Sequence, residues 1–140
     1  MHIAIIANEV IDAECPFVVS NEMDNLQRLY IPRTASQTAL SALAMARVIA
    51  SSGVDKISAI SVDPGTSIRS LRVFKQHGAD DLHALKEGAL SREAGVGAKA
   101  RVAAALVKLV GADFVICDER DEYGVIDGFA AALAQQLEWG

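Results

Sequence analysis

Aromatic side chains and basic charge are both scarce in this sequence. Phe, Trp and Tyr make up 5% of the 140 residues, and 13 Lys and Arg stand against 18 Asp and Glu, which gives a formal net charge of −5. Proteins that bind nucleic acid stack bases on aromatic rings and hold phosphates in a basic field, and anionic lipid surfaces need a similar field. We therefore expect no nucleic-acid partner and no attachment to a membrane surface.

Cysteine and long apolar runs are also scarce. Cys15 and Cys117 are too few for a disulfide framework or a zinc site, and the apolar run around Cys117 predicts a small buried hydrophobe there. No apolar stretch reaches the roughly 18 residues of a membrane span, because Lys108 interrupts the best candidate. The start of the chain lacks the basic residues of a secretory signal. We expect no membrane insertion and a reduced, cytoplasmic location.

Alanine, by contrast, is abundant, and it accompanies a pattern of alternating helices and strands. The chain has 24 alanines, and small side chains suit helices packed closely on a sheet. Three segments each end a helical stretch and precede an apolar one: Gly53-Val54-Asp55, Gly78-Ala79-Asp80 and Gly111-Ala112-Asp113. Glycine just past a helix end takes the left-handed conformation without steric cost. The alternation predicts βαβ units, and therefore an α/β fold with a mostly parallel sheet and right-handed crossovers.

The periodicity of apolar residues places the individual elements. Strands are expected at residues 3–7, 57–62, 82–85 and 114–117, and helices at 36–51, 66–77, 91–110 and 126–138. Phe17–Val19 and Leu29–Ile31 flank a polar segment and are expected to form a hairpin. Ligands of an open α/β sheet bind beyond the carboxyl ends of its strands. The loops to consider are therefore 8–12, 63–67 and 118–127.

Two segments have features of phosphate-binding motifs. Gly95-Val96-Gly97-Ala98-Lys99-Ala100 has the shape of a dinucleotide fingerprint, but that motif needs a strand ending immediately before it, and here the last strand ends near Leu85. We interpret it as a loop before a helix. Asp63-Pro64-Gly65-Thr66-Ser67 follows a strand and starts a helix, where Thr66 or Ser67 can cap the helix and free N–H groups can meet an anion. Capping is the favoured interpretation, because the lysine of a phosphate loop is missing.

Acidic side chains gather in Asp118-Glu119-Arg120-Asp121-Glu122, at the carboxyl end of a predicted strand. Carboxylates can hold Mg²⁺, but nothing in the sequence brings a second ligand group to them, and a solvated loop is the favoured interpretation. His77 and His83 have no metal-ligand spacing and are expected to be surface or packing residues. No Ser/His/Asp or Cys/His arrangement emerges, which predicts that the chain is not an enzyme on its own.

Several segments, in their order along the chain, match the pattern of one known family. The first strand and Asn8-Glu9-Val10-Ile11-Asp12 are similar to its strand and Lys-x-Val-x-Asp opening, and Pro32 precedes an alanine-rich helix as its Asn-Pro-Phe segment does. Ser61-Val62-Asp63-Pro64 through His77-Gly78-Ala79-Asp80 matches its strand, Gly-Pro, helix and Met-Gly-Ala-Asp order. Asp113-Phe114-Val115-Ile116 and Leu137-Glu138-Trp139 are similar to its Asp-Leu-Val-Leu strand and terminal Leu-(Asp/Gly)-Trp. Together they resemble the N-terminal part of the β subunit of electron transfer flavoproteins.

This resemblance implies a three-layer α/β/α domain of five strands over residues 1–140, of the Rossmann-like nucleotide-binding type that universal stress proteins share. It also implies a bound adenine nucleotide, AMP or FAD, and a flavin-bearing α-type partner subunit. The nucleotide would lie across the strand ends, with its phosphate at the N-terminus of the last helix. The implied cofactor-binding residues are Ile6, Ala7, Asn8, Ile31, Pro32, Arg33, Thr34, Val62, Asp63, Asp127, Gly128, Phe129, Ala130 and Ala131.

The phosphate end of the implied site departs from the family pattern. Gly128-Phe129-Ala130-Ala131 replaces Gln-Thr-Gly-Gln and supplies backbone N–H groups without a hydroxyl or amide side chain. Asp127 stands beside it and is expected to repel a phosphate and to cap the helix. The resemblance also places the family's last strand beyond residue 140. We therefore expect an exposed sheet edge that pairs with another chain, as a homodimer or with the partner subunit.

Two alternative functions remain open at this point. One is a module of the universal-stress type that binds adenine nucleotides without a redox partner. The other is an interaction scaffold that has kept the fold and lost the ligand. A bound nucleotide distinguishes the first alternative from the second, and a flavin-bearing partner distinguishes both from an electron transfer flavoprotein subunit.

Overall fold

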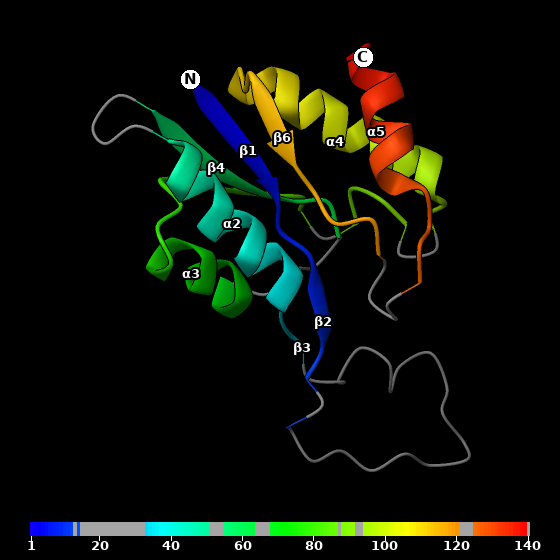
Figure 1. The fold of residues 1–140 in the computed structure, drawn as a ribbon. Helices are drawn as coiled ribbons and strands as arrows, with labels where there is room; N and C mark the ends of the chain where they lie inside the picture. Colours follow the sequence, from blue (N-terminus) through cyan, green and yellow to red (C-terminus); the bar gives the residue numbers. More distant parts are fainter. Residues whose placement is uncertain are drawn as a thin grey trace.

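Four parallel strands form the main sheet. The computed structural model describes residues 1–12, 14, 33–50, 55–63, 68–86, 88–91, 94–120 and 125–139. Within them, β1 (His2–Ile6), β4 (Lys56–Ser61), β5 (Asp81–Ala84) and β6 (Phe114–Ile116) form a sheet of order β5-β4-β1-β6 (Figure 1). Every pairing in this sheet is parallel, which confirms the predicted α/β class. The described residues thus supply four of the five strands that the resemblance implies.

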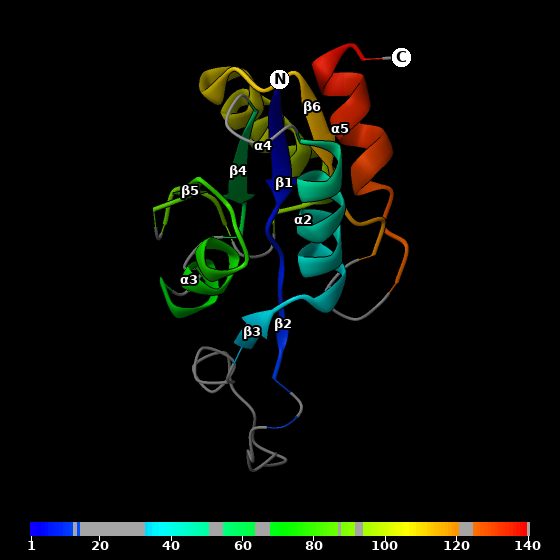
Figure 2. The same cartoon turned by 60° about the vertical axis from the view of Figure 1, so that its left-hand side comes forward.

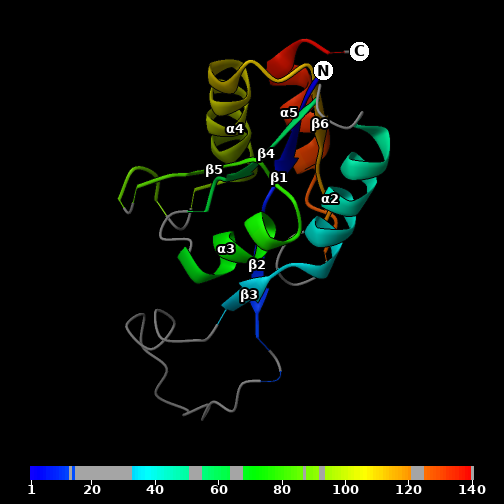
Figure 3. The ribbon, with the colours of Figure 1, turned by 90° about the vertical axis from the view of Figure 1, so that its left-hand side faces the viewer.

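Helices cover both faces of this sheet. α2 (Gln37–Ile49) and α3 (Ile68–Gln76) lie on one face, and α4 (Val96–Val110) and α5 (Phe129–Leu137) lie on the other (Figures 2 and 3). The three-layer α/β/α arrangement is therefore confirmed. The first turns of α2 and α4 lie at the carboxyl edge of the sheet, where Ser36 donates to the carbonyl after β1 and Lys99 pairs with Asp63 after β4.

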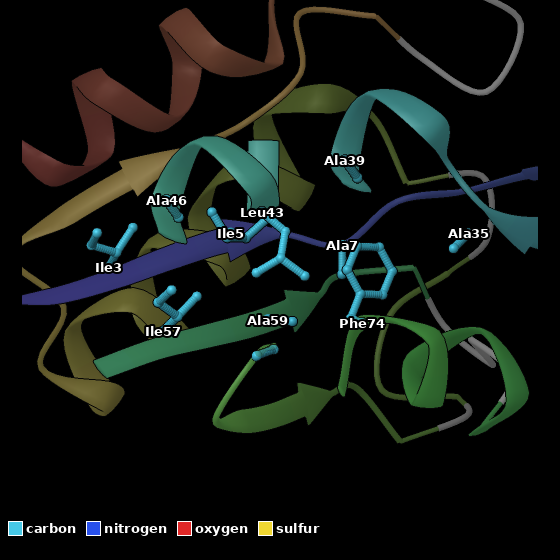
Figure 4. Close-up of a cluster of buried hydrophobic side chains, with 11 residues drawn as sticks. Ile3, Ile5, Ala7, Ala35, Ala39, Leu43, Ala46, Ile57, Ala59 and Phe74 are labelled. Atoms are coloured by element: carbon cyan, nitrogen blue, oxygen red, sulfur yellow. The ribbon is translucent and has the colours of Figure 1, made fainter. Parts of the chain in front are cut away.

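Two apolar clusters pack on the two faces of β1, because successive side chains of a strand point in opposite directions. Ile3 and Ile5 belong to the cluster under α2 and α3, whereas Ala4 and Ile6 belong to the cluster under α4 and α5. Figure 4 shows the first cluster, which also contains the ring of Phe74 from α3. Burial on both faces explains why β1 reads as a continuous aliphatic run.

A short antiparallel hairpin extends from the carboxyl end of β1. β2 (Glu9–Ile11) pairs with β3 (Arg33–Ala35), with Val10 opposite Thr34. The expectation that residues 8–12 form a loop is therefore wrong. The β-branched residues of this segment favour extended backbone and find a hydrogen-bonding partner in β3.

Two helices begin later than expected, in each case because of glycine. α4 was expected from residue 91 but begins at Val96, since Gly95 takes an extended N-cap conformation and glycine disfavours helix. α5 begins at Phe129, because Gly128 before it adopts a left-handed φ of 76°. Other expectations fall on residues outside the described ones, namely the hairpin of residues 17–19 and 29–31, the segment at Gly53, and residues 64–67.

Gly78 and Gly111 follow α3 and α4 with positive φ values, but their surroundings differ. An added Cβ meets nothing within 4 Å at Gly111 (φ +69°), whereas at Gly78 (φ +105°) it lies 2.8 Å from Cδ of Arg47. We expect Gly111→Ala to lower the free energy of unfolding by about 1 kcal/mol, the cost of a left-handed residue with a Cβ. Gly78→Ala should lower it by about 2–3 kcal/mol, because its backbone is more strained and Arg47 must move. Urea unfolding followed by circular dichroism measures both, and equal losses would contradict this difference.

Candidate ligand site at the carboxyl edge of the sheet

The carboxyl end of β1 is tied to its neighbours by backbone hydrogen bonds. The N–H of Ala7 donates to the carbonyl of Ile60 (2.7 Å), and the carbonyl of Asn8 accepts from the N–H of Ser36 (2.9 Å). Ile6 and Ala7 are buried, and Asn8 is half-buried. These bonds fix the end of the central strand against the N-terminus of α2.

Side chains at the N-terminus of α2 connect this helix to the end of β6. The hydroxyl of Thr38 donates to Oδ2 of Asp118, and Ser36 Oγ lies 2.6 Å from Thr38 Oγ1. Because the single Thr38 proton goes to Asp118, the Ser36 hydroxyl donates to Thr38. Ser36 Oγ also accepts from the N–H of Ala39 and so caps the helix. The carboxylate of Asp118 is therefore held in place by a hydroxyl from a segment far away in the sequence.

Asp127 lies just before Gly128, the N-cap residue of α5, and next to this acidic strand end. Its N–H donates to the carbonyl of Glu119 (3.3 Å), and its Oδ1 accepts from the N–H of Phe129 (2.9 Å). The N–H groups of Ala130 and Ala131 have no hydrogen-bond partner among the described residues. One N–H of the helix N-terminus is thus occupied by a carboxylate, and two remain for an anion.

A second pair of charges lies at the end of β4. Asp63 follows the buried Val62, and its Oδ1 lies 3.1 Å from Nζ of Lys99 on α4, with both side chains partly exposed. Lys99 comes from the glycine-rich segment 95–100. β5 already ends at Ala84, so the segment does not follow a strand directly, as a dinucleotide fingerprint would require. The interpretation as a loop is wrong, because all of the segment except Gly95 lies in the first turns of α4.

Cys117 lies directly after β6 and is surrounded by negative charge. Its side chain packs against the cluster under α4 and α5 but is only half-buried, so that it is more exposed than the expected buried hydrophobe. Burial raises the pKa of the Cys117 thiol, and the carboxylates of Asp118, Glu119 and Asp127 raise it further.

The raised pKa of Cys117 predicts slow alkylation. In a Cys15→Ser background, we expect iodoacetamide to react with native Cys117 at least about tenfold more slowly at about pH 8 than with the unfolded chain, because the thiolate is the reactive form. The pH at which the alkylation rate reaches half its maximum should lie above 9.0, the ordinary pKa of a cysteine thiol. The folded protein holds this proton more tightly than the unfolded chain, so the free energy of unfolding should also fall as the pH rises above that value. Equal alkylation rates in the native and unfolded states would contradict the shift.

The structure brings most of the implied cofactor-binding residues to one edge of the sheet. Ile6, Val62 and Phe129 bury their side chains in the cluster under α4 and α5, so any contact they make with a ligand comes from their backbone. Arg33 and Thr34 lie in β3, whereas Ile31 and Pro32 lie outside the described residues. The remaining implied residues lie at strand ends or at the start of α5: Ala7, Asn8, Asp63, Asp127, Gly128, Ala130 and Ala131.

Sequence reasoning missed Thr38 and Lys99. A signal for Thr38 was present, since Ser36-x-Thr38 precedes a predicted helix and such hydroxyls gather at helix N-termini. Lys99 was examined only as part of a glycine-rich motif, and its pairing with Asp63 depends on α4 crossing β4.

The described residues contain no group of three or more His, Cys, Asp and Glu that could hold a metal ion. His77 is exposed, with Nδ1 2.8 Å from the carbonyl of Val73, and His83 lies half-buried in β5. None of the helices within the described ranges has the length and apolar character to cross a membrane.

An open parallel sheet with helices on both faces, and polar groups gathered beyond the strand ends, defines the class of α/β proteins that bind ligands at the carboxyl edge. The electron transfer flavoprotein domain matches residues 26–140. The chain therefore belongs to this family of electron-carrier proteins, which confirms the resemblance drawn from the sequence. A search of curated proteins found no match to the chain.

Proposed function

We propose that the chain is a β-subunit-like electron transfer flavoprotein domain, which holds an adenine nucleotide, AMP or FAD, and supports electron transfer by a flavin-bearing α-type subunit. It catalyses no reaction on its own. The observation that carries this proposal is the match of the electron transfer flavoprotein domain to residues 26–140.

The arrangement of the carboxyl edge supports the nucleotide part of the proposal. The N–H groups of Ala130 and Ala131, for which the described part of the chain supplies no partner, lie at a helix N-terminus that carries partial positive charge, as a phosphate site needs. The end of β1 offers backbone groups to the adenosine half, and the end of β4 adds the paired charges of Asp63 and Lys99. The negative charge of Asp127 repels a phosphate at this position. The affinity for AMP should therefore be lower than the N–H groups of Ala130 and Ala131 alone would give.

Calorimetric titration with AMP tests the nucleotide part. We expect saturable binding of one AMP per chain, with GMP as the matched control that differs only in its base. Absence of binding with both AMP and FAD would overturn this part of the proposal and favour the ligand-free scaffold.

Arg33 offers a more specific test of how a phosphate is held. Its half-buried side chain lies in β3, within the segment that the family uses at its nucleotide. A guanidinium binds phosphate with strong, paired hydrogen bonds, so we expect Arg33→Ala to weaken AMP binding by about tenfold. Arg101→Ala, on the exposed side of α4, is the control and should leave the affinity unchanged. Unchanged affinity in Arg33→Ala would remove Arg33 from the site.

A further inference from the structure

Asp63 and Lys99 form an ion pair at the carboxyl edge of the sheet. Asp63 follows β4, Lys99 lies in the first turn of α4, and Oδ1 of Asp63 lies 3.1 Å from Nζ of Lys99. Their sequence neighbours Val62 and Ala100 are 2% and 0% exposed and belong to one apolar cluster. Packing of these two neighbours fixes the backbone beside each charged residue, so that the carboxylate and the ammonium group keep a defined relative position.

This ion pair is accessible to a ligand. The side chains of Asp63 and Lys99 are 26% and 30% exposed. An ammonium group has three N–H donors, and the bond to Asp63 uses one of them, so that Lys99 can donate to a ligand as well. Exposed ion pairs contribute little to the stability of a fold. Stability alone therefore gives little reason for a carboxylate and an ammonium group at this place.

The pair lies across the sheet from the N-terminus of α5. That helix follows β6, and β6 and β4 lie on the two sides of β1. Two strand spacings, about 10 Å, therefore separate the ends of β6 and β4. An extended nucleoside monophosphate spans such a distance from its phosphate to its base. A nucleotide whose phosphate meets the N–H groups of Ala130 and Ala131 brings its base to Asp63 and Lys99.

The two charged groups are complementary to one edge of adenine. Adenine presents there a hydrogen-bond donor, its exocyclic amino group, next to an acceptor, the ring nitrogen N7. An ionised carboxylate only accepts hydrogen bonds and an ammonium group only donates them, so that the pair offers the matching acceptor and donor side by side. Guanine presents two acceptors, O6 and N7, at the same edge, and one of them would face the carboxylate.

We propose that Asp63 and Lys99 select adenine as the base of the bound nucleotide: Asp63 accepts a hydrogen bond from the amino group, and Lys99 donates one to N7. This inference rests on the nucleotide binding proposed above and names the residues that choose the base. The charge of Lys99 also offsets the charge of Asp63, so that this carboxylate adds little to the repulsion of a phosphate.

Calorimetric titration of the wild-type protein with AMP and two of its analogues tests the proposal. 7-Deaza-AMP has a C–H group in place of N7, and purine riboside 5′-monophosphate lacks the amino group. Each analogue leaves one group of the ion pair without its partner on the base. We expect each to bind at least about tenfold more weakly than AMP.

Two variants assign the two hydrogen bonds. Lys99→Met removes the ammonium group and should weaken AMP binding by about tenfold. It should bind 7-deaza-AMP as tightly as AMP, while it still binds purine riboside 5′-monophosphate more weakly, because only the contact with N7 has been lost. Asp63→Ala should show the opposite pattern. An ion pair with a purely structural role would instead lower the affinity for all three nucleotides by the same factor.

Lys108→Met is the matched control. It removes the same charge near the other end of α4, where Lys108 donates to the carbonyl of Gln136. This variant should bind the three nucleotides with the wild-type affinities. Methionine is a good helix former, so that both lysine variants should unfold in urea close to the wild-type midpoint.

Several results would overturn the inference while the proposed function stands. They are equal affinities of the wild-type protein for AMP and 7-deaza-AMP, a preference for AMP over 7-deaza-AMP that persists in Lys99→Met, and tighter binding of GMP than of AMP together with retained binding of AMP. Absence of binding of both AMP and FAD to the wild-type protein would overturn the inference and the nucleotide part of the proposed function together.

Discussion

Replacing Phe74 by alanine should lower the free energy of unfolding by about 3–5 kcal/mol, a large share of the roughly 5–15 kcal/mol that stabilises a domain of this kind. The ring of Phe74 is 1% exposed and joins α3 to the cluster that contains Leu43 of α2 and Ala7 at the end of β1 (Figure 4). Several of its neighbours are alanines, whose short side chains cannot move to fill the space that the ring leaves. The cavity therefore adds to the loss of apolar burial.

Urea unfolding followed by circular dichroism measures this effect, with Val48→Ala as the matched control. Val48 lies on α2, near the same cluster in sequence, but it is 86% exposed. Its replacement should change the free energy of unfolding by no more than about 0.5 kcal/mol. A loss below about 1 kcal/mol in Phe74→Ala would contradict the packing of α3 against this face of the sheet.

Removing the charge of Asp127 should have the largest effect on AMP affinity. Two negative groups about 4 Å apart repel by roughly 1 kcal/mol in water and by about 4 kcal/mol near a protein surface. The carboxylate already accepts from the N–H of Phe129, at the helix end where the phosphate is proposed to bind. We expect Asp127→Asn to tighten AMP binding by at least about tenfold, since the amide oxygen of asparagine accepts the same hydrogen bond but the side chain carries no charge.

Glu138→Gln provides the control for the Asp127 variant. Glu138 is the C-cap of the same helix, so that its replacement removes an equal charge at the opposite end of α5. Calorimetric titration of AMP should show no change in this variant. Unchanged or weaker binding in Asp127→Asn would contradict the placement of the phosphate at the N-terminus of α5.

The main sheet could be predicted from the sequence because local signals and the covering helices agree. The run Ile3-Ala4-Ile5-Ile6 is buried on both faces, and a strand of that kind has no polar alternation. Gly111 takes the left-handed conformation that its position after a helix predicted. These features depend on neighbours in the sequence, and a single sequence displays them directly.

The candidate site was predictable only in outline. Its location beyond the strand ends follows from the parallel sheet. Asp127 was expected to cap α5, but the N-cap residue is Gly128, and Asp127 accepts instead from the N–H of Phe129 two residues later. The bond from Thr38 to Asp118 joins residues 80 positions apart. This bond exists because β6 lies beside β1 in the sheet, and no local sequence pattern indicates the order of the strands. The hairpin of β2 and β3 was missed for a related reason, since the partner of β2 lies beyond a long intervening segment.

The most direct test of the proposed function is the identity of the small molecule that leaves the purified protein on heat denaturation. The visible spectrum of the native protein is recorded first, and the supernatant is then chromatographed. We expect about one adenine nucleotide per chain, because the proposal gives each chain a single nucleotide site. AMP would leave the protein colourless, and FAD would make it yellow. A supernatant without any adenine nucleotide, from protein that remains folded and monodisperse before heating, would contradict the proposal that this domain holds one.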